Sequence, residues 1–399
     1  MTKNLSKVII IFLFDFIFVL NFMFKSEQQF SYLANSFLNG KLFFLTQPLT
    51  WNDTTFFNGN YFWPLGPFPS IVLTPFVYVS NLFGIFFSQG YLQFLIVVGV
   101  FLLIQRIAKT LKYSTNDAFF WAFAFCFASV FLGVSVVPYS WYFSQVITVF
   151  LMFLSLYEYL TKKRYFFLGI TTALIYLTRS SAALVVVLFL LDIFVLNKEK
   201  IKSKLADLAK LTAPIILAVV LLFNYNYARF GNIWEIGYSN QMIPEETAKA
   251  REYGIFSLAH LPGNLYYFLL AAPTPVFRDK LSHVLALPYI FNNPWGVGII
   301  FTSPYLIYLF FINYKEQLLK ILLITSGVIA IPIFLYYGIG FRQFGYRYSL
   351  DFLPLLFLIL IKGYKDKHNK LSLSFKTAII TSSIFNMFIF ITFFFDLLT

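Results

Sequence analysis

Charged residues are scarce in this chain, and their scarcity excludes a soluble globular protein. Only 12% of the 399 residues are Asp, Glu, Lys or Arg, whereas soluble domains average about 25%. Hydrophobic residues make up 59% of the chain. Apolar runs of about 17 residues or more, the length that a membrane helix needs, recur along the sequence. The composition therefore predicts an all-α polytopic membrane protein, with residues 1–399 forming a single integral membrane domain.

Cysteine and histidine are nearly absent as well. The single cysteine, Cys126, lies in an apolar run, so no disulfide can form within the chain. The three histidines, which include His260 and His283, have no zinc-ligand spacing. A glycine-rich phosphate loop is also missing, which argues against a soluble nucleotide as the direct donor. These residues predict no metal site.

The formal net charge of +13 carries information about topology. Lysines gather in two short linkers, at 198–210 and 362–370, as they do in cytoplasmic loops that touch anionic headgroups. Residues 229–293 instead carry balanced charge and are predicted to lie outside. The pattern favours membrane lipids over nucleic acid as a partner. It predicts a multi-pass integral protein of the cell membrane.

Eleven apolar segments are predicted to cross the membrane. They are 8–24, 70–87, 91–108, 118–137, 141–160, 165–195, 211–228, 294–313, 321–338, 348–361 and 375–395. A first extracytoplasmic loop is predicted at 25–69, and a large helical one at 229–293. The first segment resembles a signal peptide but has no small-residue cleavage site near residue 24, so it is interpreted as a retained helix.

The segment 165–195 is longer than the ~20 residues that one crossing needs, and Arg179-Ser180-Ser181 interrupts it. It is either one long element or two short helices that meet at a polar point. Treating it as one crossing satisfies the count between an outer first loop and an inner 197–210 linker. That choice, however, places Lys109, Lys112 and the basic run 162–164 outside, against the positive-inside rule.

Residues 27–39 have the pattern of an amphipathic interfacial helix. Its apolar face is formed by Phe30, Leu33, Ala34, Phe37 and Leu38. Ser26 and Gln29 fit a capping box at the start, and Gly40 suits the position after the end. This pattern places Glu27 in the first helical turn, at the membrane surface.

Two acids of the first loop are candidates for chemistry. Glu27 either complements the helix dipole or acts as a general base that deprotonates an acceptor hydroxyl. Asp53 either lies in a solvated turn or, as a second acid, orients the acceptor or binds a metal. The residue pattern alone leaves both pairs of alternatives open.

Ionisable groups inside apolar segments are the next candidates, since each costs roughly 2.5–3.5 kcal/mol at the membrane centre. Asp15 and Arg179 therefore need partners or a water-filled cavity. Asp15 fits a structural pair as well as a functional role. Arg179 is more suggestive, because Ser180 and Ser181 add hydroxyls where a phosphate could dock.

The segment FRQFGYRYSLDFLP at 341–354 brings further cations to the mouth of a predicted span. Arg342 and Arg347 are assigned there to substrate binding. Arg347 and Asp351 are spaced for an i, i+4 pair that anchors the helix end. Alternatively, Arg347 holds a phosphate leaving group through a bidentate contact and neutralises its growing charge.

Several motifs in this order resemble the GT-C superfamily of membrane glycosyltransferases, near the family 39 protein mannosyltransferases and the bacterial aminoarabinose transferases. The first is an acid followed by a helix of the form FxYLAxxFLxGKL. The others are NGNYFWPLGPFPS, FFLGITTALIYLTR, NYARFGNIWEIGYS and GYRYSLDFLP. The resemblance covers most of the chain, and none of its motifs is diagnostic alone.

The resemblance implies a GT-C-like bundle and an inverting transfer of sugar from a polyprenyl-phosphate donor to a lipid, glycan or protein acceptor. Glu27 would be the base, and Arg347 and Arg179 would face the leaving phosphate. Tyr61 and Trp63 belong to the NGNYFWPLGPFPS motif and are assigned to substrate binding. The cofactor stays open, since some members use a divalent metal such as Mg²⁺ or Mn²⁺ and others do not.

The chain departs from these families in two places. Ser26-Glu27 stands where they usually have an aspartate, often in an Asp-Glu pair. Trp63-Pro64 and Gly66-Pro67 stand where the aminoarabinose transferases have Lys-Pro-Pro. Two other functions are alternatives: an O-antigen ligase or polymerase, which lacks an acidic helical loop after its first span, and a transporter or flippase of lipid-linked sugars, which would carry more polar groups at mid-membrane.

Overall fold

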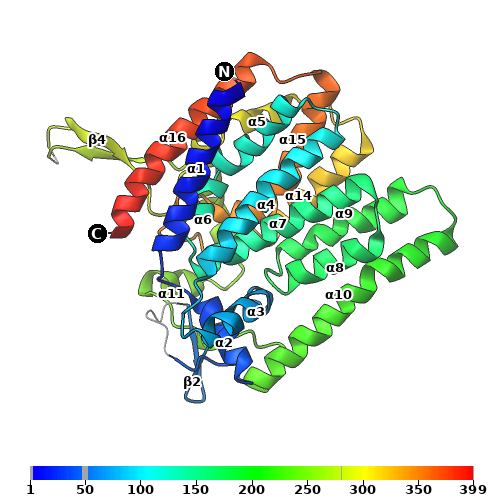
Figure 1. The fold of residues 1–399 in the computed structure, drawn as a ribbon, viewed down its shortest axis with the longest axis vertical. Helices are drawn as coiled ribbons and strands as arrows, with labels where there is room; N and C mark the ends of the chain where they lie inside the picture. The colour runs from blue at the N-terminus through cyan, green and yellow to red at the C-terminus, as the bar shows by residue number, and fades with distance from the viewer. Residues whose placement is uncertain (1–2, 47–52, 280, 399) are drawn as a thin grey trace. The chain divides into compact units, whose positions relative to one another are not determined.

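The computed structural model describes residues 3–46, 53–279 and 281–398, and these are mostly helical with two small two-stranded sheets (Figure 1). The chain divides into two compact units. Unit 1 comprises residues 1–100 and 135–248, and unit 2 comprises residues 101–134 and 249–399. Each unit is described below by itself.

Unit 1 holds most of the N-terminal half of the chain. Its elements are α1 (Lys3–Met23), α2 (Gln29–Leu38), β1 (Thr55–Phe57), β2 (Asn60–Phe62), α3 (Phe68–Leu82), most of α4 (Gln89–Thr110), α7 (Ser140–Thr161), α8 (Tyr165–Tyr176), η1 (Ala182–Val185), α9 (Val186–Leu191), η2 (Asp192–Leu196), α10 (Ile201–Phe230) and η3 (Tyr238–Asn240). The helices α8 and α10 pack closely along each other, because Gly169 lets the two backbones approach.

Unit 2 holds the C-terminal helices. Its elements are α5 (Thr115–Phe127), α6 (Phe131–Val136), α11 (Glu245–Arg251), η4 (Leu258–His260), α12 (Leu261–Leu269), β3 (Thr274–Phe277), β4 (Leu285–Phe291), α13 (Ile299–Thr302), η5 (Pro304–Phe311), α14 (Gln317–Leu335), η6 (Arg347–Asp351), α15 (Leu353–Lys367) and α16 (Leu373–Leu398); α6 and α11 extend across the unit boundary. The region 229–293, predicted to be helical, therefore also contains a β-hairpin (Figure 1).

In the part of the chain that the structure describes, five helices are long and apolar enough to cross a membrane, so the chain is a membrane protein. They are α4, α7, α10, α14 and residues 373–393 of α16. The count of eleven crossings remains a prediction. Two predicted spans are not single helices. Segment 118–137 breaks at Ser129, whose hydroxyl bonds the Phe125 carbonyl and accepts from the Phe131 N–H. Segment 294–313 breaks before Pro304, because proline forces Ser303 out of the helical conformation.

The segment 165–195 forms a helical hairpin. Its first residue and its far end meet, since the Tyr165 hydroxyl donates to the Asp192 carboxylate over 2.6 Å and Lys163 Nζ lies 2.8 Å from the same carboxylate. The chain thus returns to the side where it started. The single crossing is wrong, and the alternative of two short helices meeting at a polar point is confirmed. The basic run 162–164 therefore lies at the same end of unit 1 as the lysines of 198–204. Its position no longer conflicts with the positive-inside rule.

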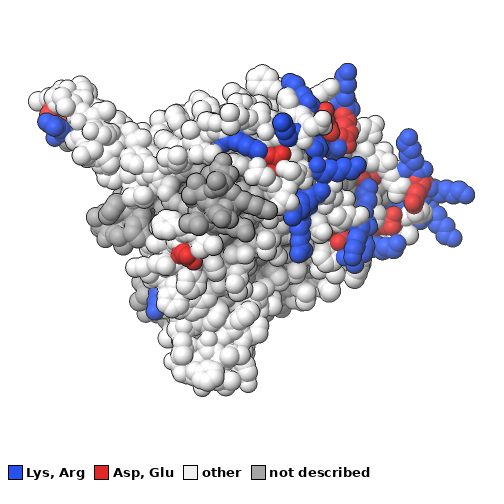
Figure 2. Space-filling view, turned by 45° about the horizontal axis from the view of Figure 1, so that its top comes forward, with Lys and Arg blue, Asp and Glu red and all other residues white. Residues whose placement is uncertain are grey.

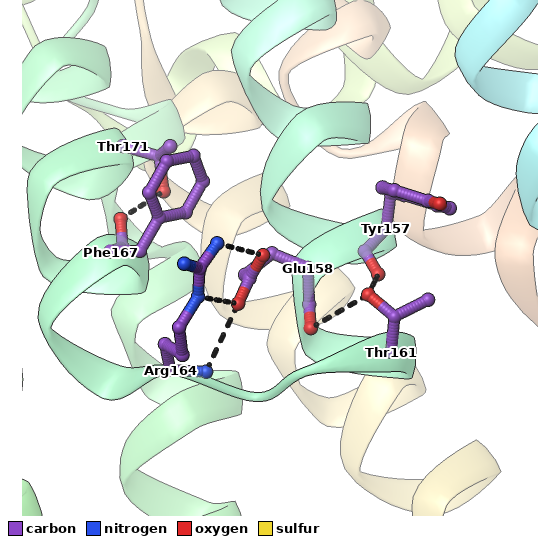
Figure 3. Close-up of polar contacts among 6 residues, drawn as sticks. All are labelled: Tyr157, Glu158, Thr161, Arg164, Phe167 and Thr171. Atoms are coloured by element: carbon purple, nitrogen blue, oxygen red, sulfur yellow. Dashed lines mark hydrogen bonds and ion pairs between the residues drawn. The ribbon is translucent and has the colours of Figure 1, made fainter.

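One carboxylate, that of Glu158, holds the turn between α7 and α8 (Figure 3). Glu158 accepts from the Arg164 side chain at Nε (2.8 Å) and at a terminal nitrogen (3.0 Å), and from the Arg164 backbone N–H (3.2 Å). Paired hydrogen bonds of this kind fix both distance and orientation. The Arg164 guanidinium also lies over the Phe167 ring, 5.4 Å from its centroid. Glu158 therefore determines where the α7–α8 turn ends and where α8 begins.

Figure 2 shows Lys and Arg gathered on part of the surface. Within unit 1, basic residues lie in the α7–α8 turn and in the segment that leads into the first turn of α10, namely Lys162, Lys163, Arg164, Lys198, Lys200, Lys202 and Lys204. The 30-residue α10 begins at this basic end and runs about 45 Å to its last residue, Phe230. This length matches a bilayer with its headgroup regions. The two ends of unit 1 can therefore face opposite sides of a membrane.

The first loop differs from its prediction at the helix start. The helix α2 begins at Gln29, and its N-cap is Gln28, which makes no side-chain capping bond. Glu27 precedes the helix with φ 55°, so both the capping box and the first-turn position of Glu27 are wrong. The predicted apolar face is confirmed: Phe30, Leu33 and Ala34 are buried, and α2 packs on α3. Gly40 follows the helix with φ 66°, as predicted.

The helical hairpin predicts the outcome of a labelling experiment. In a Cys126→Ala background, a cysteine replacing Asn58 in the β1–β2 turn and one replacing Lys162 or Lys198 should label from opposite sides of the membrane. A membrane-impermeant maleimide on intact cells should reach the first and should reach the other two only after lysis. Labelling of Lys162→Cys and Lys198→Cys from different sides would contradict a hairpin.

A second prediction concerns Gly66, where the first loop meets the tip of this hairpin. A Cβ at Gly66 would lie 2.1 Å from the Leu177 carbonyl oxygen, and this clash with backbone cannot relax cheaply. Gly66→Ala should destabilise the protein by about 1–3 kcal/mol, seen as a lower thermal midpoint in detergent. The control is Gly327→Ala, where the new Cβ meets nothing within 4 Å. Equal midpoints for both variants would contradict the close approach.

Candidate active site

Glu27 has a backbone conformation that side chains other than glycine rarely adopt. Its φ of 55° lies in the left-handed region, which costs a non-glycine residue about 1 kcal/mol or more. Three donors hold its carbonyl: the Ser140 N–H at 3.0 Å, the Ser140 hydroxyl at 2.8 Å and the Gln89 side-chain amide at 3.2 Å. The unfavourable conformation persists because these buried groups fix it.

The next residue, Gln28, is buried and joins three segments of unit 1. Its amide oxygen accepts from the Ser88 hydroxyl (3.0 Å) and from the Gln89 N–H (2.9 Å). Its amide nitrogen donates to the carbonyls of Ser26 (3.1 Å) and Pro138 (3.2 Å). Gln89 reaches Pro138 as well, over 2.5 Å. We call Gln28, Ser88, Gln89 and Ser140 the glutamine cluster; it ties the Glu27 segment to α4 and α7.

The Glu27 carboxylate lies at the edge of this cluster. Glu27 is half-buried, and the side-chain amide of the fully buried Gln29 donates to one carboxylate oxygen. Because Gln29 is the first residue of α2, the helix itself sets where this donor lies. The arrangement leaves a partly accessible acid with one oriented oxygen.

Trp63 follows the first-loop hairpin and is buried, with 1% of its surface exposed. The Arg229 guanidinium donates to its carbonyl (2.9 Å) and to the Asn226 side chain (2.7 Å), and it lies 4.0 Å from the Tyr225 ring centroid. Phe30 meets the Trp63 ring edge to face at 5.8 Å. Trp63 was predicted to bind substrate, but its burial places it behind the accessible surface.

Arg179 lies at the tip of the helical hairpin. The neighbouring Leu177 carbonyl accepts from the Phe68 N–H at 3.1 Å, so the tip packs against the exit of the first loop. Arg179 itself is half-buried, and Ser180 is exposed. The structure thus brings the Arg179 segment next to the Trp63–Phe68 segment, which sequence spacing could not reveal.

Asp53 is held by the start of the large loop. Its N–H donates to the Met242 carbonyl (2.8 Å), and the Gln241 side-chain amide donates to its carboxylate (3.3 Å). The Thr55 hydroxyl donates to the Gly237 carbonyl (2.8 Å). Asp53 also has positive φ, 63°. These bonds join the first loop to residues 237–242, and they fit a structural role for Asp53.

Tyr61 belongs to the same hairpin. Its backbone carbonyl accepts from the Phe44 N–H at 2.9 Å, and its ring lies 4.8 Å from that of Phe56.

A neighbouring turn is fixed by Glu235. Burial acts to raise the pKa of Glu235, but hydrogen bonds from the Ser239 hydroxyl and from the Gly237 N–H outweigh it and lower the pKa. Glu235 therefore stays ionised and stabilises the turn that contacts Thr55.

Unit 2 contains the other predicted cations. Arg342 is exposed and has φ 49°, whereas Arg347 is 8% exposed and lies 4.5 Å from the Tyr348 ring centroid. A series of tyrosine rings connects Arg347 to a second arginine. The first contact is between Tyr348 and Tyr336, whose ring centroids are 6.0 Å apart. The Tyr336 ring centroid lies 4.5 Å from that of Tyr337, with the ring planes tilted by 52°.

Arg251, from the large loop, donates to the Tyr337 hydroxyl and lies 4.6 Å from that ring centroid. The tyrosine cluster Tyr336, Tyr337 and Tyr348 thus brings Arg251 and Arg347 to one part of unit 2. Sequence reasoning missed Arg251, since it read the loop only for its charge balance. The pattern carried no signal for this contact, because the two arginines are almost a hundred residues apart.

Among residues 3–46, 53–279 and 281–398 no group of three or more His, Cys, Asp or Glu side chains gathers as metal ligands would. The donor set around Glu27 is made of amides and hydroxyls, which do not fit a divalent cation site. The exposed Asp15 on α1 is likewise an isolated acid among the described residues.

No protein-family model and no curated protein matches the chain. Solved structures of an oligosaccharyltransferase from Archaeoglobus fulgidus are similar to it. The apo form is 14% identical, with a TM-score of 0.44, over 91% of this chain and 51% of that chain. A second structure, in complex with an inhibitory peptide and a dolichol-phosphate, is 14% identical with a TM-score of 0.43, over 90% of this chain and 50% of that chain.

The chain therefore spans about half the length of these enzymes. At 14% identity and a TM-score below 0.5, this likeness carries no argument about activity.

The glutamine cluster predicts the effect of one substitution. Gln28→Leu would leave the Ser88 hydroxyl and the Gln89 N–H buried without their acceptor, at about 1–3 kcal/mol for each lost partner. The thermal midpoint should fall, and limited proteolysis should cut first within residues 24–30. The exposed Asn39→Ala is the control and should leave both measurements unchanged. An unchanged midpoint for Gln28→Leu would show that the cluster does not hold the Glu27 segment.

Proposed function

We propose that the protein is a glycosyltransferase that moves a sugar from a polyprenyl-phosphate carrier to an acceptor hydroxyl or amine at the outer face of the cell membrane. The observation that carries the proposal is the backbone of Glu27, held with φ 55° by the buried glutamine cluster. Non-glycine residues in such conformations concentrate at functional sites, where the surrounding structure over-determines them.

The chemistry assigned to Glu27 is general-base catalysis. Its carboxylate takes the proton from the acceptor, whose oxygen or nitrogen attacks the anomeric carbon of the sugar. The bond from that carbon to the carrier phosphate breaks, and the phosphate leaves with the electron pair. Attack from the face opposite the phosphate inverts the anomeric configuration. A positioned base contributes about 10²–10⁴-fold to the rate.

Gln29 supports this assignment as a positioning residue. Its amide donates to one carboxylate oxygen of Glu27 and so fixes the orientation of the group that would take the acceptor proton. The amide is neutral and does not itself titrate.

Arg179, at the hairpin tip beside the first-loop exit, is assigned to the departing phosphate in unit 1. It would neutralise the charge that grows as the bond breaks. Within unit 2, Arg342 and Arg347 stay predicted substrate-binding residues, and Arg251, which shares the tyrosine cluster with Arg347, is a further candidate there. The lysine-rich end of unit 1 then faces the cytoplasm, and the end with Glu27 faces outward. We therefore expect a multi-pass chain that binds its donor from the outer leaflet.

The test is transfer of radiolabelled sugar by the purified protein from a panel of polyprenyl-phosphate sugars. Glu27→Gln should reduce turnover by at least about 100-fold, because the amide cannot accept the proton. Asp53→Asn should retain most of the activity, since Asp53 bonds to Gln241 and Met242 in a structural contact. Both variants should keep the thermal midpoint of the wild type.

Equal turnover by wild type and Glu27→Gln would overturn the assignment of the base. Loss of activity with Asp53→Asn alone would move that role to Asp53. Specific binding of one donor without turnover, at every acceptor tried, would favour a transporter of lipid-linked sugars.

A further inference from the structure

Two aromatic side chains flank the residue that holds Glu27. Ser140, whose N–H and hydroxyl bond the Glu27 carbonyl, lies between Tyr139 and Trp141 at the start of α7. Both rings are half-buried, whereas Ser140 is buried. Sequence reasoning passed over them, because aromatics are 22% of the chain and none stands out by pattern.

Trp141 is supported from behind. Its ring stacks on that of the buried Trp63, with centroids 6.4 Å apart and planes 27° apart. Trp63 is in turn held by Phe30 at the edge of its ring and by Arg229 at its carbonyl. One face of the Trp141 indole therefore packs on a fixed layer, while the residue as a whole stays half-buried.

Tyr139 extends the same surface. Its ring lies 5.8 Å from that of Trp141 and 6.3 Å from that of Phe24, which follows α1. A second contact at 5.6 Å joins it to the buried Tyr142. The two half-buried rings thus form one aromatic surface, fixed to the polypeptide within one residue of the groups that bond Glu27.

We propose that Tyr139 and Trp141 form a platform on which the pyranose ring of the transferred sugar stacks. The inference rests on the proposed function and adds the residues that hold the sugar itself. A pyranose has a face of C–H bonds, which packs on the negative face of an aromatic ring. Sites of this kind combine aromatic walls with a few polar groups that fix orientation. Here Glu27 supplies the polar group, and the platform is joined to it through Ser140.

A different role for these rings is an interfacial belt that only anchors the protein in the membrane. The two roles differ in what they predict. A belt residue affects stability or insertion and leaves the Michaelis constant for the donor unchanged. A platform residue changes that constant.

The first experiment compares Trp141→Ala, Trp141→Phe and Trp234→Ala. Trp234 is 73% exposed and serves as the matched control for loss of an accessible tryptophan. Trp141→Ala should raise KM for the sugar donor by about 3- to 10-fold with little change in kcat, as loss of one stacking contact predicts. Trp141→Phe keeps a ring and should stay within about twofold of wild type, as should Trp234→Ala.

The second experiment measures binding without turnover, in the Glu27→Gln background. Polyprenyl-phosphate sugar should quench tryptophan fluorescence, while polyprenyl phosphate without a sugar should quench less. The sugar-dependent part should vanish in Trp141→Phe, because that variant removes the reporting indole. Sugar-dependent quenching that persists in Trp141→Phe, or a KM unchanged in Trp141→Ala, would overturn the platform.

The two proposals can fail separately. Turnover by wild type with no effect of Trp141→Ala would overturn the platform and leave the transferase intact. Absence of turnover together with sugar-dependent quenching through Trp141 would overturn the transferase and keep a sugar-binding surface. Absence of both turnover and quenching overturns both.

Discussion

The three hydrogen bonds to the Glu27 carbonyl are the interaction on which the rest of unit 1 depends. Without them the left-handed conformation of Glu27 would relax, and the chain would enter α2 at another angle. The helix α2 carries Gln29 and Phe30, so the donor to the Glu27 carboxylate and the support of Trp63 would move with it. A small group of amides and hydroxyls therefore fixes an acid, a helix and an aromatic layer together.

The membrane explains why this group is made of glutamine and serine. Backbone groups that leave a helix near the lipid need internal partners, because hydrocarbon offers none. Neutral amides supply donors and acceptors at a lower desolvation cost than charged side chains. At the other end of unit 1, where water is close, the same task falls to ion pairs, namely Glu158 with Arg164 and Asp192 with Lys163.

The sequence predicted the class of fold and much of the local structure, since these depend on composition and period. The apolar face of α2, Gly40 after its end and the polar break at Arg179 follow from the order of residues. The return of the hairpin 165–196, the contact of Gly66 with Leu177 and the bond from Arg229 to Trp63 could not be predicted. Each joins segments distant in sequence, and no spacing rule encodes them. The sequence identified Glu27 as a candidate by its position after the first helix. It did not reveal the hydrogen bonds that hold the Glu27 backbone.

The most direct test of the account is an experimental structure of the Glu27→Gln variant with a polyprenyl-phosphate sugar bound. The account predicts that the anomeric carbon faces the side chain at position 27 and that the sugar ring lies on Trp141. It also predicts that an arginine side chain contacts the phosphate of the carrier. A sugar bound beside Asp53, or at any place from which residue 27 cannot reach the acceptor, would contradict it.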